Sequence, residues 1–329
     1  MILLTGGAGF IGSNLFAAFQ AAHPSVPVVV VDVLGMDDKW QNLKNRELYR
    51  LYRPAQLSEA LAAHCNVIDT VFHMGAISST TEKDADLVVE TNIQLSQQLW
   101  HWCAANDKRF IYASSASVYG NGSAGFNDAA TLEQMQRYTP LNPYAWSKLA
   151  FDRYAVRLLN SHAKKPQQWA GLRFFNVYGA NEYHKGGQQS VIPQFTRQIQ
   201  ETGRCRLFKS HRSDYQDGGQ LRDFVHVDDV VRVMLWLYDT PEVSGIFNVG
   251  SGKARSFNDL AQAVFKALGK TPAIDYIDMP GSLRRAYQYF TEAELTALRA
   301  AGYTAETTSL EDGVAAYVQG YLLKEDMYR

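Results

Sequence analysis

The sequence predicts an α/β fold with a doubly wound parallel sheet, because short aliphatic runs alternate with amphipathic ones through its first half. The runs that have the character of buried strands are residues 1–6, 26–32, 67–75 and 109–115. Residues 13–23 and 89–106, which lie between them, have the apolar spacing of helices. Strands that alternate with helices form βαβ units, and helices then cover both faces of their sheet.

The alternation of strands and helices continues into the second half of the chain and ends at about Gly179. A helix is expected over 142–159 and a strand over 170–179, and loops follow Gly179. Further helical segments are expected at 191–200, 256–269, 291–303 and about 310–322, and a strand at 245–252. Residues 214–239 should form a polar loop, a short strand and a helix. No repeat or low-complexity linker separates the parts. We therefore expect residues 1–175 plus about 222–248 to form a nucleotide-binding domain, and about 176–221 plus 249–329 a smaller, interleaved α/β domain.

Composition indicates a soluble globular protein whose partners are small molecules. The 329 residues are 46% hydrophobic and 20% charged, and the net charge of −1 gives no reason to expect nucleic acid or an anionic membrane as partner. Three widely spaced cysteines without CxxC pairs argue against a disulfide framework or a zinc site. Because the chain also opens on a strand-like run without a signal pattern, we expect a cytoplasmic protein with no metal.

A glycine-rich turn, TGGAGFIG, places Gly6, Gly9 and Gly12 between the first strand and the first helix. Glycines at this spacing permit a tight turn and the close approach of a pyrophosphate, which the free N–H groups of the helix N-terminus then bind. Asp32 ends the next strand 20 residues after Gly12, where a carboxylate can accept hydrogen bonds from an adenosine ribose. The sequence therefore predicts a Rossmann-type domain that binds a dinucleotide.

Two residues bear on which dinucleotide is bound. Asp32 favours NAD, because its carboxylate suits the free ribose hydroxyls. Lys39 follows in DDKWQN, close enough to meet the 2′-phosphate of NADP. The alternative for Lys39 is an ordinary solvated lysine in a loop, so both cofactors remain open on the residues alone.

A serine pair and a tyrosine–lysine pair form a second pattern. The segment YASSASVYG ends the fourth strand with Ser114 and Ser115, and YAWSK opens the next helix with Tyr144 and Lys148 at i and i+4, on one helix face. Free tyrosine has a pKa of about 10, but an adjacent ammonium and a positive nicotinamide ring would favour its phenolate. Tyr144 is therefore a candidate proton acceptor, with Ser115 hydrogen-bonded to the substrate oxygen.

These motifs together resemble the extended short-chain dehydrogenase/reductases, the NAD-dependent epimerase/dehydratase superfamily. The resemblance covers essentially the whole chain and includes HMGAISS (73–79) and RDFVHVDDV (222–230). Within that superfamily the sequence is similar to the ADP-glyceromanno-heptose 6-epimerase family. The segments that carry this similarity are SSTTEKDAD, FFNVYGANEYHKGG, SGIFNVGSGKARSF and RRAYQYFTEAELTALRAAGY.

The resemblance implies an isomerase that inverts C6″ of ADP-D-glycero-D-manno-heptose to give ADP-L-glycero-D-manno-heptose. Hydride transfer to NADP⁺ would form a 6″-ketone, and return of the hydride to the opposite face would complete the inversion. The product would supply heptose for the lipopolysaccharide core. The first domain would bind NADP and the smaller domain the ADP-sugar. The family also implies a homo-oligomer, with a pentamer as one candidate.

Lys185 receives its role from the same resemblance. Tyr144 would handle the proton of one epimer and Lys185 that of the other, a two-base arrangement in which each group needs a pKa near the working pH. A lysine reaches such a pKa through burial or a cationic neighbour. Gly186 and Gly187 would let the loop pack closely while Lys185 points inward, and His184 would be structural. The alternative for Lys185 is a solvated surface lysine.

The remaining site positions also follow from the resemblance. The implied cofactor-binding residues are Gly6, Gly9, Phe10, Ile11, Gly12, Asp32, Lys39, Met74, Gly75, Ala76, Ile77, Ser78, Thr91, Asn92, Tyr144, Lys148, Val177 and Lys185. The implied substrate-binding residues are Ser115, Asn176, Gly187, Gln194, Arg222 and Tyr287. Arg222 would pair with the ADP phosphates, although a surface ion pair with Asp223 or Asp228 is the alternative.

Some positions depart from the family pattern. Gly187, Gln194 and Val33 stand where a serine, a histidine and an asparagine would be familiar, and an additional segment, SHRSDYQDGGQ (210–220), precedes Arg222. These departures concern substrate contacts and the cofactor preference rather than the chemistry.

Three other functions compete with this one. A nucleotide-sugar 4-epimerase has no evident need for Lys185, and a 4,6-dehydratase needs carboxylates beside the serine, as in TDEVYG, which SSASVYG lacks. A non-enzymatic dinucleotide-sensing protein would have little use for Tyr144 and Lys148, yet both are present. Neither an HExxH nor a P-loop motif occurs.

Overall fold

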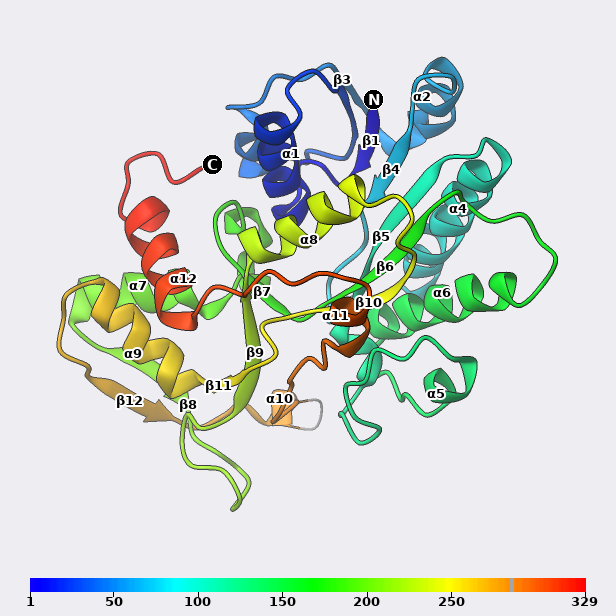
Figure 1. The fold of residues 1–329 in the computed structure, drawn as a ribbon. Helices are drawn as coiled ribbons and strands as arrows, with labels where there is room; N and C mark the ends of the chain where they lie inside the picture. The colour runs from blue at the N-terminus through cyan, green and yellow to red at the C-terminus, as the bar shows by residue number, and fades with distance from the viewer. Residues whose placement is uncertain (285–286) are drawn as a thin grey trace.

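The computed structural model describes residues 1–284 and 287–329, and within these ranges seven parallel strands form the main sheet. Their order is β10-β6-β5-β4-β1-β2-β3 (Figure 1). The strands are β1 (Ile2–Thr5), β2 (Val28–Val31), β3 (Arg50–Tyr52), β4 (Thr70–His73), β5 (Arg109–Ser115), β6 (Trp169–Phe174) and β10 (Gly245–Val249). The predicted doubly wound α/β fold is confirmed.

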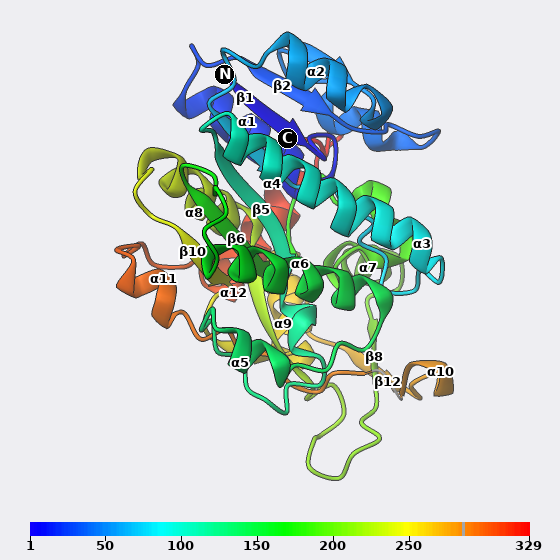
Figure 2. The ribbon, with the colours of Figure 1, turned by 90° about the vertical axis from the view of Figure 1, so that its right-hand side faces the viewer.

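The strands at the centre of the sheet are buried along their whole length. Every residue of β1, β2 and β4 is buried, which explains their continuous aliphatic character. Trp100 and Phe151 pack on one face, from α4 (Leu95–Ala105) and α6 (Pro143–Leu159), which lie in front of the sheet in Figure 2. The other face is covered by α1 (Phe10–Ala22) and α8 (Val227–Asp239).

A separate hydrophobic core lies beside the main sheet, at the lower left of Figure 1. Here β7 (Asn176–Tyr178), β9 (Leu221–His226) and β11 (Ala254–Ser256) form one small sheet, and β8 (Cys205–Phe208) pairs with β12 (Ile274–Ile277) in another. The helices that pack around this core are α7 (Val191–Thr202), α9 (Phe257–Ala267) and α12 (Leu310–Tyr317). The apolar periodicity of 191–200 and 256–269 correctly predicts the first two of these helices.

The shorter elements are where sequence and structure differ most. They are α2 (Leu57–Ala63), α3 (Ala85–Val88), α5 (Leu132–Gln136), α10 (Gly281–Arg284), α11 (Thr296–Ala300), the 3₁₀ segments Asp38–Leu43, Pro54–Gln56, Ala116–Tyr119 and Tyr183–Gln188, and the π segments Val89–Gln94 and Val318–Leu322. The helix expected over 89–106 therefore begins with a π turn, and the one expected over 291–303 is confined to α11. The short strands β3, β8, β11 and β12 have no clear sequence signal, because they are edge or partly exposed strands.

In the part of the chain that the structure describes, no helix combines the length and the apolar character needed to cross a bilayer.

Candidate active site

A cavity of about 680 Å³ opens at the carboxyl ends of the main sheet. The chain runs from β1 outward to β3 on one side and returns to β4 on the other, so β1 and β4 flank the point where the strand order reverses. Open α/β sheets bind their ligands at this point. The cavity is lined by many predicted site residues: Gly6, Gly9, Phe10, Ile11, Gly12, Asp32, Lys39, Met74, Gly75, Ala76, Ser78, Ser115, Tyr144, Lys148, Val177, Lys185 and Gly187.

The glycine turn has the shape that a pyrophosphate requires. Gly6 has a φ of +70°, and a Cβ added there would lie 2.5 Å from the backbone nitrogen of Gly75. A Cβ on Gly12 would lie 2.1 Å from the carbonyl oxygen of Gly6. Gly9 is the N-cap of α1 and offers no side chain to its free N–H groups. The turn therefore fits a dinucleotide, because these N–H groups face the cavity without a side-chain partner.

Asp32 and Lys39 form an ion pair at the same end of the cavity. Lys39 Nζ lies 2.7 Å from Asp32 Oδ1 and also donates to the carbonyl of Val33 at 2.7 Å. The other carboxylate oxygen accepts from the backbone N–H of Ala8 at 2.8 Å. Lys39 is therefore not the solvated loop lysine of the alternative interpretation. It lies beside the carboxylate that would meet the ribose.

Three of the implied cofactor residues do not line the cavity. Ile77 and Thr91 are half-buried, and Asn92 is almost completely buried. The Asn92 amide donates to the carbonyl of Ile77 at 3.0 Å and accepts from its N–H at 2.9 Å. It also donates to Ser147 Oγ on α6 at 3.0 Å. Asn92 thus holds the loop after β4 against the helix that carries Tyr144.

The start of α6 fixes Tyr144 and Lys148 on the cavity wall. Asn142 caps the helix by accepting from the N–H of Ala145 at 2.8 Å, and Pro143 occupies its first position. Burial raises the pKa of the Tyr144 hydroxyl, and a hydrogen bond with the Ser115 side chain partly opposes this. Lys148 Nζ donates to the carbonyl of Ala113 at 2.8 Å, and burial lowers the pKa of its amine to about 8. Tyr144 and Ser115 thus place two hydroxyl groups side by side on the cavity wall.

Lys185 lies in the 3₁₀ segment Tyr183–Gln188 and faces the same cavity as Tyr144, from a different part of the chain. Its Nζ lies 5.1 Å from the centre of the Phe10 ring. Burial lowers the pKa of the Lys185 amine, and the charge of Glu182 opposes this shift. His184 also lines the cavity, and its Nδ1 lies 3.1 Å from the side-chain amide of Asn42.

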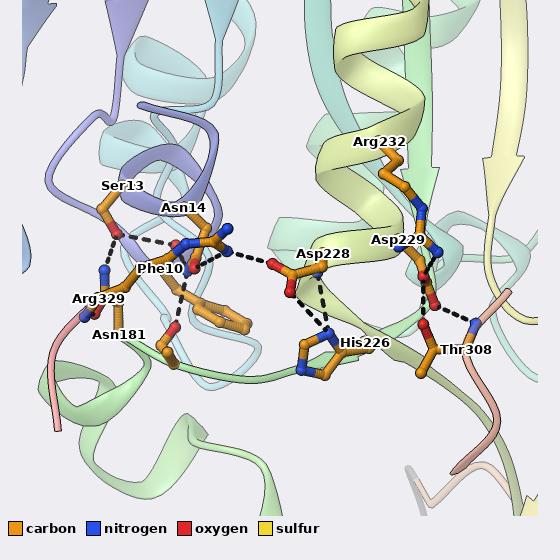
Figure 3. Close-up of polar contacts among 11 residues, drawn as sticks. Phe10, Ser13, Asn14, Asn181, His226, Asp228, Asp229, Arg232, Thr308 and Arg329 are labelled. Carbon is orange, nitrogen blue, oxygen red and sulfur yellow. Dashed lines mark hydrogen bonds and ion pairs between the residues drawn. The ribbon is translucent and has the colours of Figure 1, made fainter. Parts of the chain in front are cut away.

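A polar network anchors the chain just before this loop (Figure 3). Asn181 has the left-handed φ of +70° and is completely buried. Its amide donates to Ser13 Oγ at 3.0 Å, and its carbonyl-type Oδ1 accepts from the backbone N–H of Arg329 at 3.0 Å. The Arg329 guanidinium donates to Asn14 at 3.1 Å and forms an ion pair with Asp228. Residues of α1, α8 and the 329 end of the chain therefore fix the position at which the Lys185 loop begins.

Four implied substrate residues lie outside the cavity lining, in the direction of the smaller core: Asn176, Gln194, Arg222 and Tyr287. Arg222 is 7% exposed, and its guanidinium lies 5.1 Å from the centre of the Tyr287 ring. Within residues 1–284 and 287–329, no carboxylate forms an ion pair with Arg222. Asp223 is instead bonded to Ser251, Gly252 and Ala293, and Asp228 to Arg329, so the surface ion pair of the alternative does not form.

The exposed members of this group have few contacts. Gln194 is exposed on α7, and Asn176 is exposed at the start of β7, where its Oδ1 accepts from Thr291 Oγ1 at 3.3 Å. Both side chains are therefore open to solvent.

Sequence reasoning missed several polar residues that shape the site. Asp152, Arg173 and Glu182 are completely buried, and Thr80 and Gln188 line the cavity. Asp152 follows Lys148 by one helical turn, a spacing that signals a shared helix face. Glu182 precedes Lys185 by three residues, and no pattern in the sequence shows that its carboxylate is buried.

Comparison with known proteins shows which family this chain is similar to. Residues 2–250 match the model of the NAD dependent epimerase/dehydratase family. An ADP-L-glycero-D-manno-heptose-6-epimerase of Nitratidesulfovibrio vulgaris is 48% identical over 329 residues, which cover 99% of each chain. The solved enzyme of the same name from Helicobacter pylori is 31% identical with a TM-score of 0.78, over 97% of this chain and 95% of that one.

A solved UDP-glucuronic acid 4-epimerase of Bacillus cereus, in complex with NAD, is more distant. It is 26% identical with a TM-score of 0.74, over 97% of this chain and 98% of that one. The resemblance inferred from the sequence motifs is thereby confirmed over the full length. The chain belongs to the NAD dependent epimerase/dehydratase family.

Proposed function

We propose that this protein is an epimerase that converts ADP-D-glycero-D-manno-heptose into ADP-L-glycero-D-manno-heptose by inverting C6″. The observation that carries the proposal is the placement of Lys185. It faces the cavity that Tyr144 lines, and it comes from a separate segment of the chain. Relatives with this name match essentially the whole chain, which supports the same substrate.

The chemistry divides between the cofactor and two side chains. A bound nicotinamide supplies reversible acceptance of a hydride from C6″. Tyr144 accepts the hydroxyl proton of one epimer as that hydride leaves, and Ser115 hydrogen-bonds the same oxygen. The ketone then rotates in the site so that its opposite face is open to the hydride. The Lys185 ammonium donates a proton to the ketone oxygen as the hydride returns to C6″. The sugar thus gains and loses one hydride and one proton, and exchange with solvent restores the two side chains.

Burial shifts the pKa values of Lys185 and Tyr144 in opposite directions. It lowers the pKa of the Lys185 amine, which brings its neutral form closer to working pH. It raises the pKa of Tyr144, so the phenolate depends on favourable charge nearby. The positive ring of an oxidised nicotinamide supplies such a charge. Proton acceptance by Tyr144 would therefore be favoured while a bound nicotinamide is oxidised.

The family and its NAD-bound members support a nicotinamide dinucleotide as cofactor. We infer that the preferred form is NADP, because Lys39 can turn from Asp32 toward a 2′-phosphate, although NAD suits Asp32 itself. The buried Arg222 guanidinium, without a carboxylate partner in the described ranges, favours contact with the ADP phosphates. Asn176, Gln194 and Tyr287 would complete the substrate contacts.

The roles of the two parts of the fold, the cellular location and the oligomeric state are proposed from the family resemblance. The main sheet with its helices would bind the cofactor, and the smaller core with its sheets would bind the ADP-sugar. We further propose a cytoplasmic homo-oligomer that supplies heptose for lipopolysaccharide.

The test is a substrate panel with the purified protein. Incubation with ADP-D-glycero-β-D-manno-heptose should yield the L-glycero epimer, observed by NMR, and UDP-glucose and GDP-mannose should remain unchanged. A mass spectrum of the cofactor released on denaturation should show NADP. Turnover of a UDP- or GDP-sugar without conversion of ADP-heptose would reject the proposal and favour a 4-epimerase. Tight cofactor binding without turnover of any sugar nucleotide would favour a dinucleotide sensor.

A further inference from the structure

The carboxylate of Glu182 is completely buried next to the loop that carries Lys185. Both of its oxygens bind Ser190. The backbone N–H of Ser190 donates to Oε2 at 2.6 Å, and its hydroxyl donates to Oε1 at 2.7 Å. Among residues 1–284 and 287–329, no lysine, arginine or histidine forms an ion pair with it. A buried carboxylate is costly, so a role beyond packing is expected.

The Glu182–Ser190 contact joins the two ends of the Lys185 loop. Inside the loop, the N–H of Lys185 donates to the carbonyl of Glu182 at 3.1 Å, and the Gln189 side chain donates to the carbonyl of Tyr183 at 2.6 Å. The first bond is a local turn within the loop, and the second joins residues one step inside the Glu182–Ser190 contact. The carboxylate therefore closes a ring of nine residues around the catalytic lysine.

The glycines of the loop cannot fix its shape by themselves. Gly186 has a φ of +52°, and a Cβ added to Gly186 or Gly187 would meet no atom within 4 Å. The space beside these two glycines is open among the described residues, and glycine has the greatest freedom to change conformation. The direction of the Lys185 side chain must therefore be set by contacts elsewhere. The double hydrogen bond from Ser190 to the buried Glu182 carboxylate spans the whole loop, outside the bond from Gln189 to Tyr183.

The charge of Glu182 also acts on Lys185. Burial lowers the pKa of the Lys185 amine, and the Glu182 carboxylate raises it. Burial raises the pKa of Glu182, and the hydrogen bonds from Ser190 and the charge of Lys185 oppose this rise without cancelling it. The other titratable groups that face this pair are Tyr183 and His184 on the loop itself and Tyr317 on α12. The charges of Lys39, Asp37 and Asp32 also act on the pKa of His184. Burial also raises the pKa values of Tyr183 and Tyr317, so their hydroxyls bring no negative charge to Lys185, and Glu182 is the acidic group whose charge acts on that amine.

We propose that Glu182 is a positioning residue for Lys185: through Ser190 it holds the loop in the shape that turns the lysine into the cavity, and it places a buried carboxylate at the base of that loop. The inference rests on the proposed function of Lys185 and deepens it. It assigns the shape and the charge of the site to a residue that contacts neither cofactor nor sugar.

Two variants separate shape from charge. Glu182→Gln keeps the size and one acceptor for Ser190 but removes the charge, so the pH limb of the epimerisation rate that belongs to Lys185 should move to lower pH. Ser190→Ala keeps the charge but removes one hydrogen bond, so the rate should fall several-fold with the limb close to its wild-type position. Glu201→Gln, at an exposed position on α7, is the matched control and should change neither.

A second readout does not depend on epimerisation. ¹³C-methylation of the lysines of the NADP-loaded protein gives NMR signals that titrate, and Lys185→Arg assigns the Lys185 signal. The titration midpoint should be lower in Glu182→Gln than in the wild type. An unchanged midpoint and an unchanged pH limb would overturn the role of the charge, and a wild-type rate in Ser190→Ala would overturn the role in shape. If the wild type does not epimerise ADP-heptose, the proposed function fails, whereas the shift in the Lys185 midpoint still tests the Glu182 contact.

Discussion

Asp152 and Arg173 form an ion pair of 2.9 Å in which neither side chain is exposed, behind the wall of the cavity. The same carboxylate accepts from Ser114 Oγ and from the Tyr112 hydroxyl, both at 3.0 Å. Arg173 donates onward to the Tyr119 hydroxyl at 3.0 Å. One buried pair thus joins α6, which carries Tyr144, to the strands β5 and β6 beneath it.

Replacing Asp152 with asparagine should destabilise the fold strongly. The change leaves the Arg173 guanidinium buried without its counter-charge, and breaking a buried pair in this way costs about 3–5 kcal/mol. Urea unfolding followed by circular dichroism measures the loss. Asp278→Asn, which removes an exposed pair with Lys209, is the control and should have little effect. A loss for Asp152→Asn no larger than that of the control would show that the pair does not stabilise the fold.

Tyr144→Phe and Lys185→Ala should each abolish most of the epimerisation while the cofactor stays bound. Each removes a proton-transfer group, and such groups typically contribute about 10²–10⁴-fold to the rate. The measurements are the rate of formation of the L-glycero epimer and the cofactor content of the purified variants.

The chain offers a matched control for each of these variants. Tyr154 lies on the same helix as Tyr144 but contacts His101 on the outside of the protein, and Lys209 is an exposed lysine. Tyr154→Phe and Lys209→Ala should retain wild-type rates. Wild-type activity in Tyr144→Phe or in Lys185→Ala would refute the two-base assignment.

How far the sequence predicts the structure depends on whether a contact is local. The glycine turn, Asp32 and the Tyr144–Lys148 pair follow from spacing within single segments, and the structure brings them to one cavity. Asn92 is a different case: its position in the sequence is compatible with lining the cofactor, yet its amide is buried and binds Ile77 and Ser147. Such a difference depends on how separate segments pack, which local spacing does not encode.

Lys185 is a site residue that local spacing in the sequence does not identify. Family resemblance, and not periodicity, is what singles it out in a glycine-rich loop. The residues that hold this loop come from distant parts of the chain. Asn181 binds Ser13 and Arg329, and Lys185 itself lies over Phe10. No sequence pattern relates positions so far apart, and the contacts become visible only in the folded protein.

Lys39→Ala should shift the cofactor preference from NADP toward NAD. A charge-assisted contact with a phosphate contributes about 1.5–3 kcal/mol, so the Kd for NADP⁺ should rise about tenfold or more. The change also frees the Asp32 carboxylate, which can then bind the ribose hydroxyls of NAD. Fluorescence titration with NADPH and NADH measures both affinities. Lys44→Ala, in the same region of the chain, should leave the ratio unchanged, and an equal effect of Lys39→Ala on both cofactors would contradict the contact.

Arg329→Ala should loosen the point at which the Lys185 loop begins. The variant loses the ion pair with Asp228 and the hydrogen bond to Asn14, which together contribute about 1–2 kcal/mol at this partly exposed site. We expect a lower free energy of unfolding and a reduced epimerisation rate at unchanged cofactor affinity. Lys324→Ala, an exposed position nearby, is the control. A variant with the unfolding free energy and the rate of the wild type would show that Arg329 does not anchor the loop.

His73 should make the fold sensitive to acid. Its ring is buried between Thr5 Oγ1 at 2.7 Å and Ser96 Oγ at 2.9 Å, and burial lowers its pKa to about 3. Between about pH 6.5 and that value, the unfolded chain binds a proton that the folded protein does not. The free energy of unfolding should therefore fall as the pH falls, by up to about 1.4 kcal/mol per pH unit for this group.

The variant His73→Gln isolates this contribution. It should be less stable than the wild type at pH 7, because the hydrogen bonds are altered, but its stability should depend less steeply on pH between 6.5 and 4. His184, whose pKa burial lowers to about 4, acts in the same direction and leaves a residual slope. His162→Gln is the matched control, because that ring is exposed in the folded and the unfolded chain alike. Urea unfolding at several pH values gives the slopes, and equal slopes for His73→Gln and the wild type would mean that the folded protein takes up the proton at His73 after all.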